Sequence, residues 1–210
     1  TLCSCMARRD GRWMKASIYL SRGLRNGLAD LRCGGRLLNG RWLRPGGIAE
    51  AHQNSDHAAL RRIFRGRVRP GDVLVDVGCG RGRVLDHWLS HFPGHRIIGI
   101  ELDPDVAART AHRLRRHENC SVLSGDALEL MPLEGTLFYL YNPFGAEQIA
   151  ELRSRLAARP RSSRPLVILY HHPKYLETFA ERPAWQIEHV ALGGTRLAPF
   201  DDLAVITRTY

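Results

Sequence analysis

From residue 73 onward the chain alternates short apolar runs with longer amphipathic stretches, and this alternation restricts its fold more than any other sequence feature. Apolar runs bounded by turn residues predict buried strands, and the stretches between them predict helices. Strands that alternate with helices form a parallel sheet with helices on both faces. The predicted strands are Val73–Val77, Arg96–Leu102, Ser121–Ser124, Thr136–Tyr141, Leu166–Tyr170, Trp185–Leu192 and Leu203–Tyr210. The predicted helices are His57–Phe64, Gly82–Phe92, Pro104–His117, Ala146–Ala158 and Lys174–Glu181.

The last two predicted strands break the alternation, because no helix is predicted between them. The loop that joins them holds Gly193, Gly194 and Pro199, which are typical turn residues. Two strands joined in this way pair antiparallel. The predicted fold is therefore α/β: a doubly wound, mostly parallel seven-stranded sheet with an antiparallel C-terminal hairpin at one edge.

The positive charge of the chain lies in its first third. The formal net charge is +10, and residues 1–70 hold 15 Arg and Lys against 4 Asp and Glu. This asymmetry favours a polyanionic partner such as nucleic acid, an anionic membrane surface or an acidic substrate. Only Lys15 and Lys174 are lysines, so a solvated surface that uses arginine as its default cation fits equally well.

A turn at residues 44–47, of sequence RPGG, divides the chain into a basic N-terminal segment (residues 1–50) and a main domain (residues 51–210). Within the first segment, apolar residues recur at helical spacing between Trp13 and Leu31, which predicts a short amphipathic helix with a basic face. Such a helix can cap the domain or touch a membrane surface, and we favour capping. The apolar positions are Ile18, Leu20, Leu24, Leu28 and Leu31.

Composition narrows the location of the protein. No stretch approaches 18 apolar residues, so no transmembrane helix is expected, and residues 1–15 lack the apolar region of a secretory signal. The five cysteines are too scattered for a disulfide framework, and Cys3 and Cys5 have no second pair nearby to complete a zinc site. We expect a cytoplasmic protein without a bound metal.

The segment Val73–Leu85 carries the strongest chemical signal. A strand that contains Asp76 runs into a loop with glycines at alternate positions, Gly78, Gly80 and Gly82, which lets the backbone turn sharply and approach a ligand. A dinucleotide site requires the spacing G-x-G-x-x-G, whereas here the third glycine comes one residue early. Asp76 would repel a pyrophosphate and would favour a ligand with a positively charged group.

Carboxylates also stand at the ends of the next two strands. Glu101 ends the second strand, where a carboxylate can accept hydrogen bonds from both hydroxyls of a ribose. Asp126 follows the third strand, where it can accept a hydrogen bond from the exocyclic amine of an adenine. Leu102 is placed to pack on the adenine face.

This constellation resembles the class I S-adenosylmethionine-dependent methyltransferases through three stretches, Asp76–Gly82, Gly99–Leu102 and Ser124–Ala127. The resemblance covers roughly residues 50–210. It implies S-adenosylmethionine as cofactor, with the glycines facing its methionine and ribose parts, and a contribution from Asn54, Ser55 or Asp56 ahead of the first strand. The cofactor-binding residues expected from it are Asp76, Gly78, Cys79, Gly80, Gly82, Glu101, Leu102, Asp126, Ala127 and Asn142.

Candidates for contact with the methyl acceptor lie after the fourth and fifth strands. Members of this family that methylate amino groups carry (Asn/Asp)-Pro-Pro-aromatic here, and this chain has Asn142-Pro143-Phe144, one proline short. His171 and His172 are adjacent, so on a strand they point to opposite faces and at most one reaches the pocket. A histidine there can act as general base. The expected catalytic residues are Asn142, Tyr141 and His171.

The sequence leaves three functions open. The first is an S-adenosylmethionine-dependent methyltransferase with a small molecule, a protein side chain or RNA as acceptor, an anionic acceptor being favoured by the basic first third. The second is an NAD-dependent oxidoreductase on a related sheet, against which the glycine spacing and Asp76 count. The third is a non-catalytic basic module that binds nucleic acid. The acceptor and the oligomeric state are not fixed by the sequence.

Overall fold

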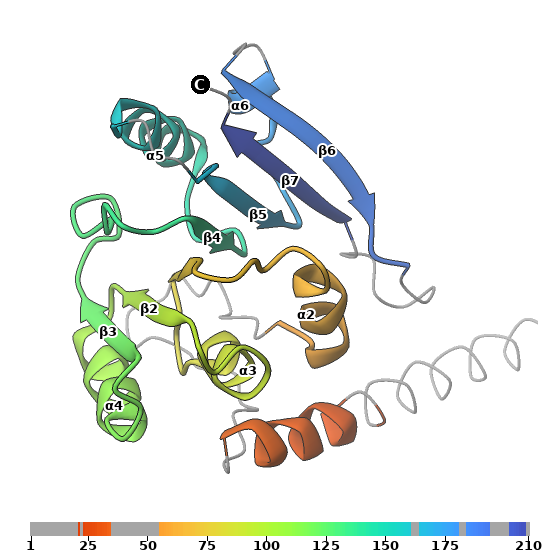
Figure 1. Cartoon of the computed structure of the whole chain (residues 1–210), viewed down its shortest axis with the longest axis vertical. Coiled ribbons are helices and arrows are strands. Elements are labelled where there is room, and N and C mark those ends of the chain that lie inside the picture. Colours follow the sequence, from red (N-terminus) through yellow and green to blue (C-terminus); the bar gives the residue numbers. More distant parts are fainter. Residues whose placement is uncertain are drawn as a thin grey trace, which may run out of the picture.

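The structure is a computed structural model that describes residues 21, 23–34, 55–160, 164–180, 184–193 and 202–208. Its centre is a seven-stranded sheet with the strand order β3-β2-β1-β4-β5-β7-β6 (Figure 1). The strands are β1 (Val73–Val77), β2 (Arg96–Glu101), β3 (Cys120–Ser124), β4 (Leu137–Leu140), β5 (Val167–His171), β6 (Trp185–Ala191) and β7 (Asp202–Arg208). The helices with defined bounds are α2 (His57–Phe64), α3 (Arg83–His91), α4 (Pro104–Leu114), α5 (Ala146–Ala158) and α6 (Glu177–Ala180).

The first five strands are parallel to one another, and β7 is antiparallel to both β5 and β6. This confirms the predicted fold class and the antiparallel C-terminal hairpin. The hairpin enters the sheet through its second strand, because β7 pairs with β5 and leaves β6 outermost. The helix predicted over Lys174–Glu181 is much shorter than expected, since α6 spans only Glu177–Ala180.

Two apolar layers hold the sheet between its helices. On one face, α5 and α6 bury Leu152 and Phe179 against the strands. On the other face, α2, α3 and α4 bury Leu60, Leu85 and Leu114. Strands covered on both faces have near-continuous apolar sequences, as the parallel strands here do. The carboxyl ends of the parallel strands, where α/β sheets bind ligands, therefore open along one rim of the sheet.

A helical segment at residues 23–34 lies beside α3 and α2 and is drawn in red in Figure 1. It contacts the domain with its polar side, because Asn26 and Asp30 are buried while Leu24, Leu28 and Leu31 are exposed. The predicted helix between Trp13 and Leu31 overlaps this segment, and its first part lies outside the described residues. The apolar spacing did not reveal which side contacts the domain, because that is decided by a charged residue of α3 that needs a partner.

Candidate active site

The glycine loop between β1 and α3 is fastened to the end of β2. The backbone N–H groups of Gly78 and Cys79 both donate to the carbonyl oxygen of Ile100, at 2.9 Å each. Gly78, Gly80 and Gly82 have φ angles of 80°, 52° and 81°, a left-handed conformation that glycine adopts at little cost. The alternate glycines of the sequence therefore mark the positions at which the chain must turn.

Glu101 connects this loop to the next strand. Its Oε2 accepts a hydrogen bond from the N–H of Gly80 at 2.8 Å, and its Oε1 accepts one from the N–H of Asp103 at 2.9 Å. Each carboxylate oxygen has two acceptor positions, so each can accept one further hydrogen bond. The buried carboxylate can thus hold the loop and still bind a vicinal diol such as that of a ribose.

Asp76 is the least satisfied polar group of the site. It is buried, and its Oδ2 has no hydrogen-bond partner among the residues that the structure describes. Burial, and after it the nearby charge of Glu101, raises the pKa of Asp76 from the ordinary value of 3.8 to about 8. A ligand that brings a cationic N–H group to this carboxylate would supply the missing partner and favour the charged form.

The raised pKa of Asp76 predicts a pH-dependent stability. The folded protein keeps a proton on Asp76 that the unfolded chain releases near pH 4. The contribution of this protonation to the free energy of unfolding is therefore complete below pH 4 and is lost as pH rises through about 8. Asp76→Asn cannot ionise. Between about pH 4 and pH 8, the free energy of unfolding of this variant should rise relative to that of the native protein by up to about 1.4 kcal/mol per pH unit. Urea unfolding of both proteins at several pH values measures the difference, and a difference independent of pH would contradict the raised pKa.

The adenine-side candidates lie beside Glu101. The N–H of Gly125 donates to the carbonyl oxygen of Glu101 at 2.9 Å, which brings the turn after β3 to the end of β2. Asp126 is half-buried, and its Oδ1 accepts the N–H of Leu128 at 2.8 Å. Leu102 is 60% exposed, an unusual exposure for a leucine next to a buried carboxylate. Its position allows it to cover a flat apolar ligand.

Two of the predicted cofactor residues direct their side chains away from the rim. The side chain of Cys79 is buried in the core on the α3 face, and that of Ala127 in the core on the α5 face. A side chain at Gly99 would come within 2.7 Å of the Cys79 sulfur, so the glycine in β2 makes room for this packing. Cys79 and Ala127 can therefore serve a ligand through their backbone groups only.

The Asn142-Pro143 turn reaches the glycine loop. A Cβ placed on Gly78 would lie 3.4 Å from Cβ of Pro143, so the turn after β4 and the turn after β1 are in close proximity. Asn142 has a φ of 46°, a left-handed conformation that is unusual for a residue other than glycine. Its Oδ1 lies 3.4 Å from the backbone nitrogen of Lys174. Strained backbone of this kind is often found at functional sites.

Tyr141 and His171 are in contact, as their rings stack with centroids 4.6 Å apart. The Nδ1 of buried His171 lies 2.9 Å from the hydroxyl of Tyr139, which in turn lies 2.7 Å from the hydroxyl of Ser55. Burial raises the pKa of Tyr139 well above its ordinary value, so this hydroxyl stays protonated. The hydrogen-bond chain from Ser55 through Tyr139 to His171 could not be predicted from the sequence, because Tyr139 lies inside an apolar strand and no motif marks it.

His172 is directed elsewhere. Its φ is 52°, and its Nδ1 lies 3.3 Å from a carboxylate oxygen of Asp202 on β7. The two adjacent histidines thus have different neighbours, but the cause is not strand alternation, because β5 ends at His171 and His172 has a left-handed backbone. Among the residues suggested ahead of the first strand, Ser55 contacts the site through Tyr139, Asp56 caps α2, and Asn54 lies outside the described residues.

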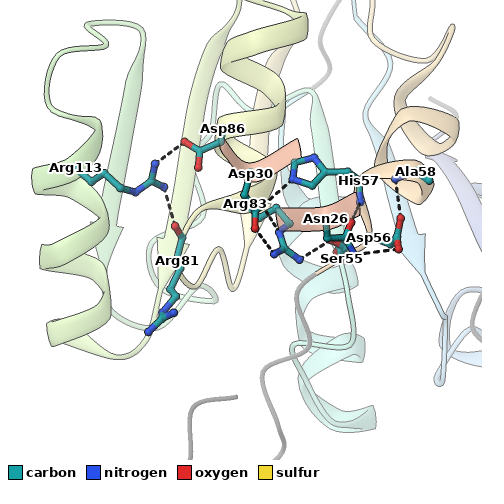
Figure 2. Close-up of polar contacts among 10 residues, drawn as sticks. All are labelled: Asn26, Asp30, Ser55, Asp56, His57, Ala58, Arg81, Arg83, Asp86 and Arg113. Carbon is teal, nitrogen blue, oxygen red and sulfur yellow. Dashed lines mark hydrogen bonds and ion pairs between the residues drawn. The ribbon is translucent and has the colours of Figure 1, made fainter. Parts of the chain in front are cut away.

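A second polar network joins the helical segment at residues 23–34 to the end of the glycine loop (Figure 2). Arg83 donates from Nε and Nη2 to the two carboxylate oxygens of Asp30, at 2.7 Å each, and Nη1 donates to the carbonyl oxygen of Ser55. The Nε2 of His57 lies 2.8 Å from Asp30 Oδ1. Arg83, Asp30 and His57 are all buried.

The sequence held a partial signal for this network. Arg83 stands where a dinucleotide loop would have its third glycine, and it begins a helix whose first residues are all buried. A buried guanidinium requires a carboxylate partner. Asp30 could not be chosen from the sequence, because it lies 53 positions away in the helical segment.

Helix α4 supports the loop from its other side. Thr110 Oγ1 donates to the carbonyl oxygen of Gly80 at 2.9 Å, and Arg113 Nη2 donates to the carbonyl oxygen of Arg81 at 2.7 Å. Arg113 also pairs with Asp86 of α3, with 2.6 Å between Nη1 and Oδ1 (Figure 2). Helix α4 thereby holds the carbonyl groups of Gly80 and Arg81, and the end of β2 holds the first three N–H groups of the loop.

Residues 74–158 match the family model described as "Methyltransferase domain". This match includes the glycine loop and the carboxylate at the end of β2. Residues 74–158, together with the strand order, are thus similar to the class I S-adenosylmethionine-dependent methyltransferases. This confirms the resemblance seen in the sequence. It favours the methyl donor over NAD for the glycine loop.

The names of individual relatives specify different acceptors. The "Ribosomal RNA small subunit methyltransferase A" of Synechococcus elongatus is 32% identical over 80 residues, which are 38% of this chain and 28% of that protein. The "Erythromycin 3''-O-methyltransferase" of Saccharopolyspora erythraea is 29% identical over 136 residues, 61% of this chain and 40% of that protein. The match therefore spans less than half the length of either relative.

Solved structures share the fold. An RNA methyltransferase from Salinibacter ruber in complex with S-adenosyl-L-homocysteine has a TM-score of 0.52 at 23% identity, covering 73% of this chain and 91% of that one. The SAH-bound Podospora anserina methyltransferase PaMTH1 has a TM-score of 0.57 at 15% identity, covering 75% of this chain and 80% of that one. None of the helices in the described part of the chain has the length and apolar character needed to cross a bilayer.

Proposed function

We propose that this chain transfers a methyl group from S-adenosylmethionine to an acceptor nucleophile. The observation that carries the proposal is the buried carboxylate of Asp76 near Glu101 at the glycine loop, whose Oδ2 has no hydrogen-bond partner among the described residues. A cofactor with a cationic amino group and a ribose diol would supply hydrogen-bond donors to both carboxylates. When bound, S-adenosylmethionine supplies an electrophilic methyl group on its sulfonium.

The residues divide between cofactor and acceptor. Asp76 would bind the amino group, Glu101 the ribose hydroxyls, and Asp126 and Leu102 the adenine. Because the alternate glycines have no side chains, the cofactor could approach the backbone of the loop closely. Cys79 and Ala127 would contact it through their main-chain groups. On the other side of the rim, Asn142, Tyr141 and His171 would face the acceptor. The proposed cofactor-binding glycines are Gly78, Gly80 and Gly82.

Asn142 is the best placed of the three proposed catalytic residues, because its turn lies against Gly78. Its side-chain oxygen can accept a hydrogen bond from an acceptor N–H or O–H and so orient the nucleophile. His171 can receive a proton, with its ring orientation fixed by Tyr139 and by stacking on Tyr141. The names of the relatives specify ribosomal RNA and erythromycin, so RNA and small molecules are both candidate acceptors.

Calorimetry with the demethylated product, S-adenosylhomocysteine, tests the cofactor. This ligand carries the same amino group and ribose, and it should bind with a proton released near pH 7, because its ammonium lowers the raised pKa of Asp76. Titrations in two buffers of different ionisation enthalpy measure that proton. NAD should give at least about tenfold weaker binding. Equal binding of NAD, or no binding of S-adenosylhomocysteine, would contradict the proposal.

Transfer itself is tested with a labelled methyl donor and a cell extract. The native chain should deposit label in one fraction, whether RNA, protein or small molecules, and Asn142→Ala should slow this labelling while it retains affinity for S-adenosylhomocysteine. If the native chain binds the product but no fraction is labelled above the level of an enzyme-free control, the third hypothesis, a non-catalytic binding module, is favoured instead.

A further inference from the structure

The helical segment at residues 23–34 has an apolar face that is exposed in the described part of the structure. Leu24, Leu28 and Leu31 are 67%, 49% and 47% exposed. Their spacing of four and three residues places them along one side of a helix with 3.6 residues per turn. Leucines exposed singly are common, but three in one stripe form a contiguous apolar surface, and such surfaces mark interaction sites.

The orientation of this face is fixed by the opposite side of the same helix. Asn26 and Asp30 are buried, and they lie about half a turn away from Leu24 and Leu28. Asp30 forms the ion pair with Arg83, and Asn26 Nδ2 donates to Asp56 at 3.1 Å (Figure 2). Because these contacts lock the polar side onto α2 and α3, the leucine face is held pointing away from the domain.

The surroundings of the leucine face are positively charged. Arg25 and Arg32, on the same helical segment, are both exposed. Between residues 12 and 36 the sequence holds six Arg and Lys, and its single acidic residue is Asp30, whose charge is already paired with Arg83. An apolar stripe flanked by exposed cations is the pattern of helices that lie in the interface of an anionic membrane.

We infer that this face, formed by Leu24, Leu28 and Leu31 with Arg25 and Arg32, docks the protein on the surface of an anionic lipid bilayer. A second copy of the chain fits less well, because pairing two such faces would bring the surrounding cations together. Nucleic acid also fits less well, because its phosphates would bind the arginines and leave the leucines in water. The inference does not depend on the methyl-transfer reaction.

The test is flotation of the full chain with vesicles. Wild-type protein should float with vesicles of phosphatidylglycerol and phosphatidylcholine, and binding to phosphatidylcholine alone should be at least about tenfold weaker. The triple variant Leu24→Ser, Leu28→Ser, Leu31→Ser should bind the anionic vesicles at least about tenfold less than wild type. Arg25→Gln with Arg32→Gln should lower binding and weaken its dependence on salt.

Matched controls separate docking from folding. Leu133 is 73% exposed outside this helical segment, so Leu133→Ser should bind vesicles like wild type. The triple variant should unfold at the same urea concentration as wild type, because its leucines face solvent. Far-UV circular dichroism of the same variant should also be unchanged, since Asp30 and Asn26 still hold the helix.

Several results would overturn the inference. One is the absence of vesicle binding by the wild type. Another is equal binding by the triple variant, which would leave only electrostatic attraction of a basic chain. A third is a wild-type dimer in light scattering that the triple variant loses, without vesicle binding, which would assign the face to a second copy. Leucine-dependent binding of single-stranded RNA without vesicle binding would assign it to nucleic acid.

Discussion

Replacing Asp30 with asparagine should lower the free energy of unfolding by about 3–5 kcal/mol, the cost of leaving a buried charge without its partner. Asp30 is fully buried, and the side chain of Arg83 is only 4% exposed. Asparagine keeps the shape of the side chain but removes the charge that compensates the guanidinium. Urea or thermal unfolding followed by circular dichroism measures the change.

Two controls define the origin of this loss. Glu118→Gln removes an exposed carboxylate and should change stability by no more than about 0.5 kcal/mol. Asp30→Leu combined with Arg83→Met removes both charges, and it should recover much of the stability lost in Asp30→Leu alone, because apolar residues of similar volume can replace a buried pair. If the double variant is as unstable as the single one, packing rather than charge is responsible.

Glu101→Ala should weaken binding of S-adenosylhomocysteine by about 1–3 kcal/mol, or roughly 5- to 150-fold, the scale of lost charge-assisted hydrogen bonds. The carboxylate is proposed to bind the ribose, and it also accepts the N–H groups of Gly80 and Asp103. Its removal therefore deprives the ligand of a partner and loosens the glycine loop. Calorimetry at constant pH gives the affinity directly.

The matched control for Glu101 is Glu134, whose carboxylate forms an ion pair with Arg96 at the surface, where it is 46% exposed. Glu134→Ala should leave the affinity unchanged. Glu101→Gln retains one carbonyl acceptor, so its loss of affinity should lie between those of the native protein and Glu101→Ala. Native affinity in Glu101→Ala would remove this carboxylate from the proposed site.

Much of the fold was predictable because local pattern and tertiary environment agree in the parallel strands. Val73–Val77 is both the predicted strand and the observed β1, and Ala146–Ala158 is both the predicted helix and α5. The glycines and Glu101 were predictable for a related reason, since a sharp turn and a strand-end carboxylate leave their mark at fixed sequence spacing.

Other features could not be read from the sequence, because they depend on contacts between distant segments. The pairing of Asp30 with Arg83 joins two helices across 53 positions. In the sequence, Tyr139 is indistinguishable from the other strand residues around it. The role of its hydroxyl follows only from its hydrogen bonds with Ser55 and His171. The exposure of Leu24 likewise follows from which side of its helix the domain binds, and helical periodicity carries no information on that choice.

The insertion of β7 between β5 and β6 has a consequence for biosynthesis. During translation β6 leaves the ribosome before its hydrogen-bonding neighbour β7 has been synthesised. Until then, one edge of β5 is unpaired as well. The sheet can close only when residues 202–208 have emerged. A nascent chain that stalls shortly before this point would present an open, apolar β edge, the form most prone to aggregation and to capture by chaperones.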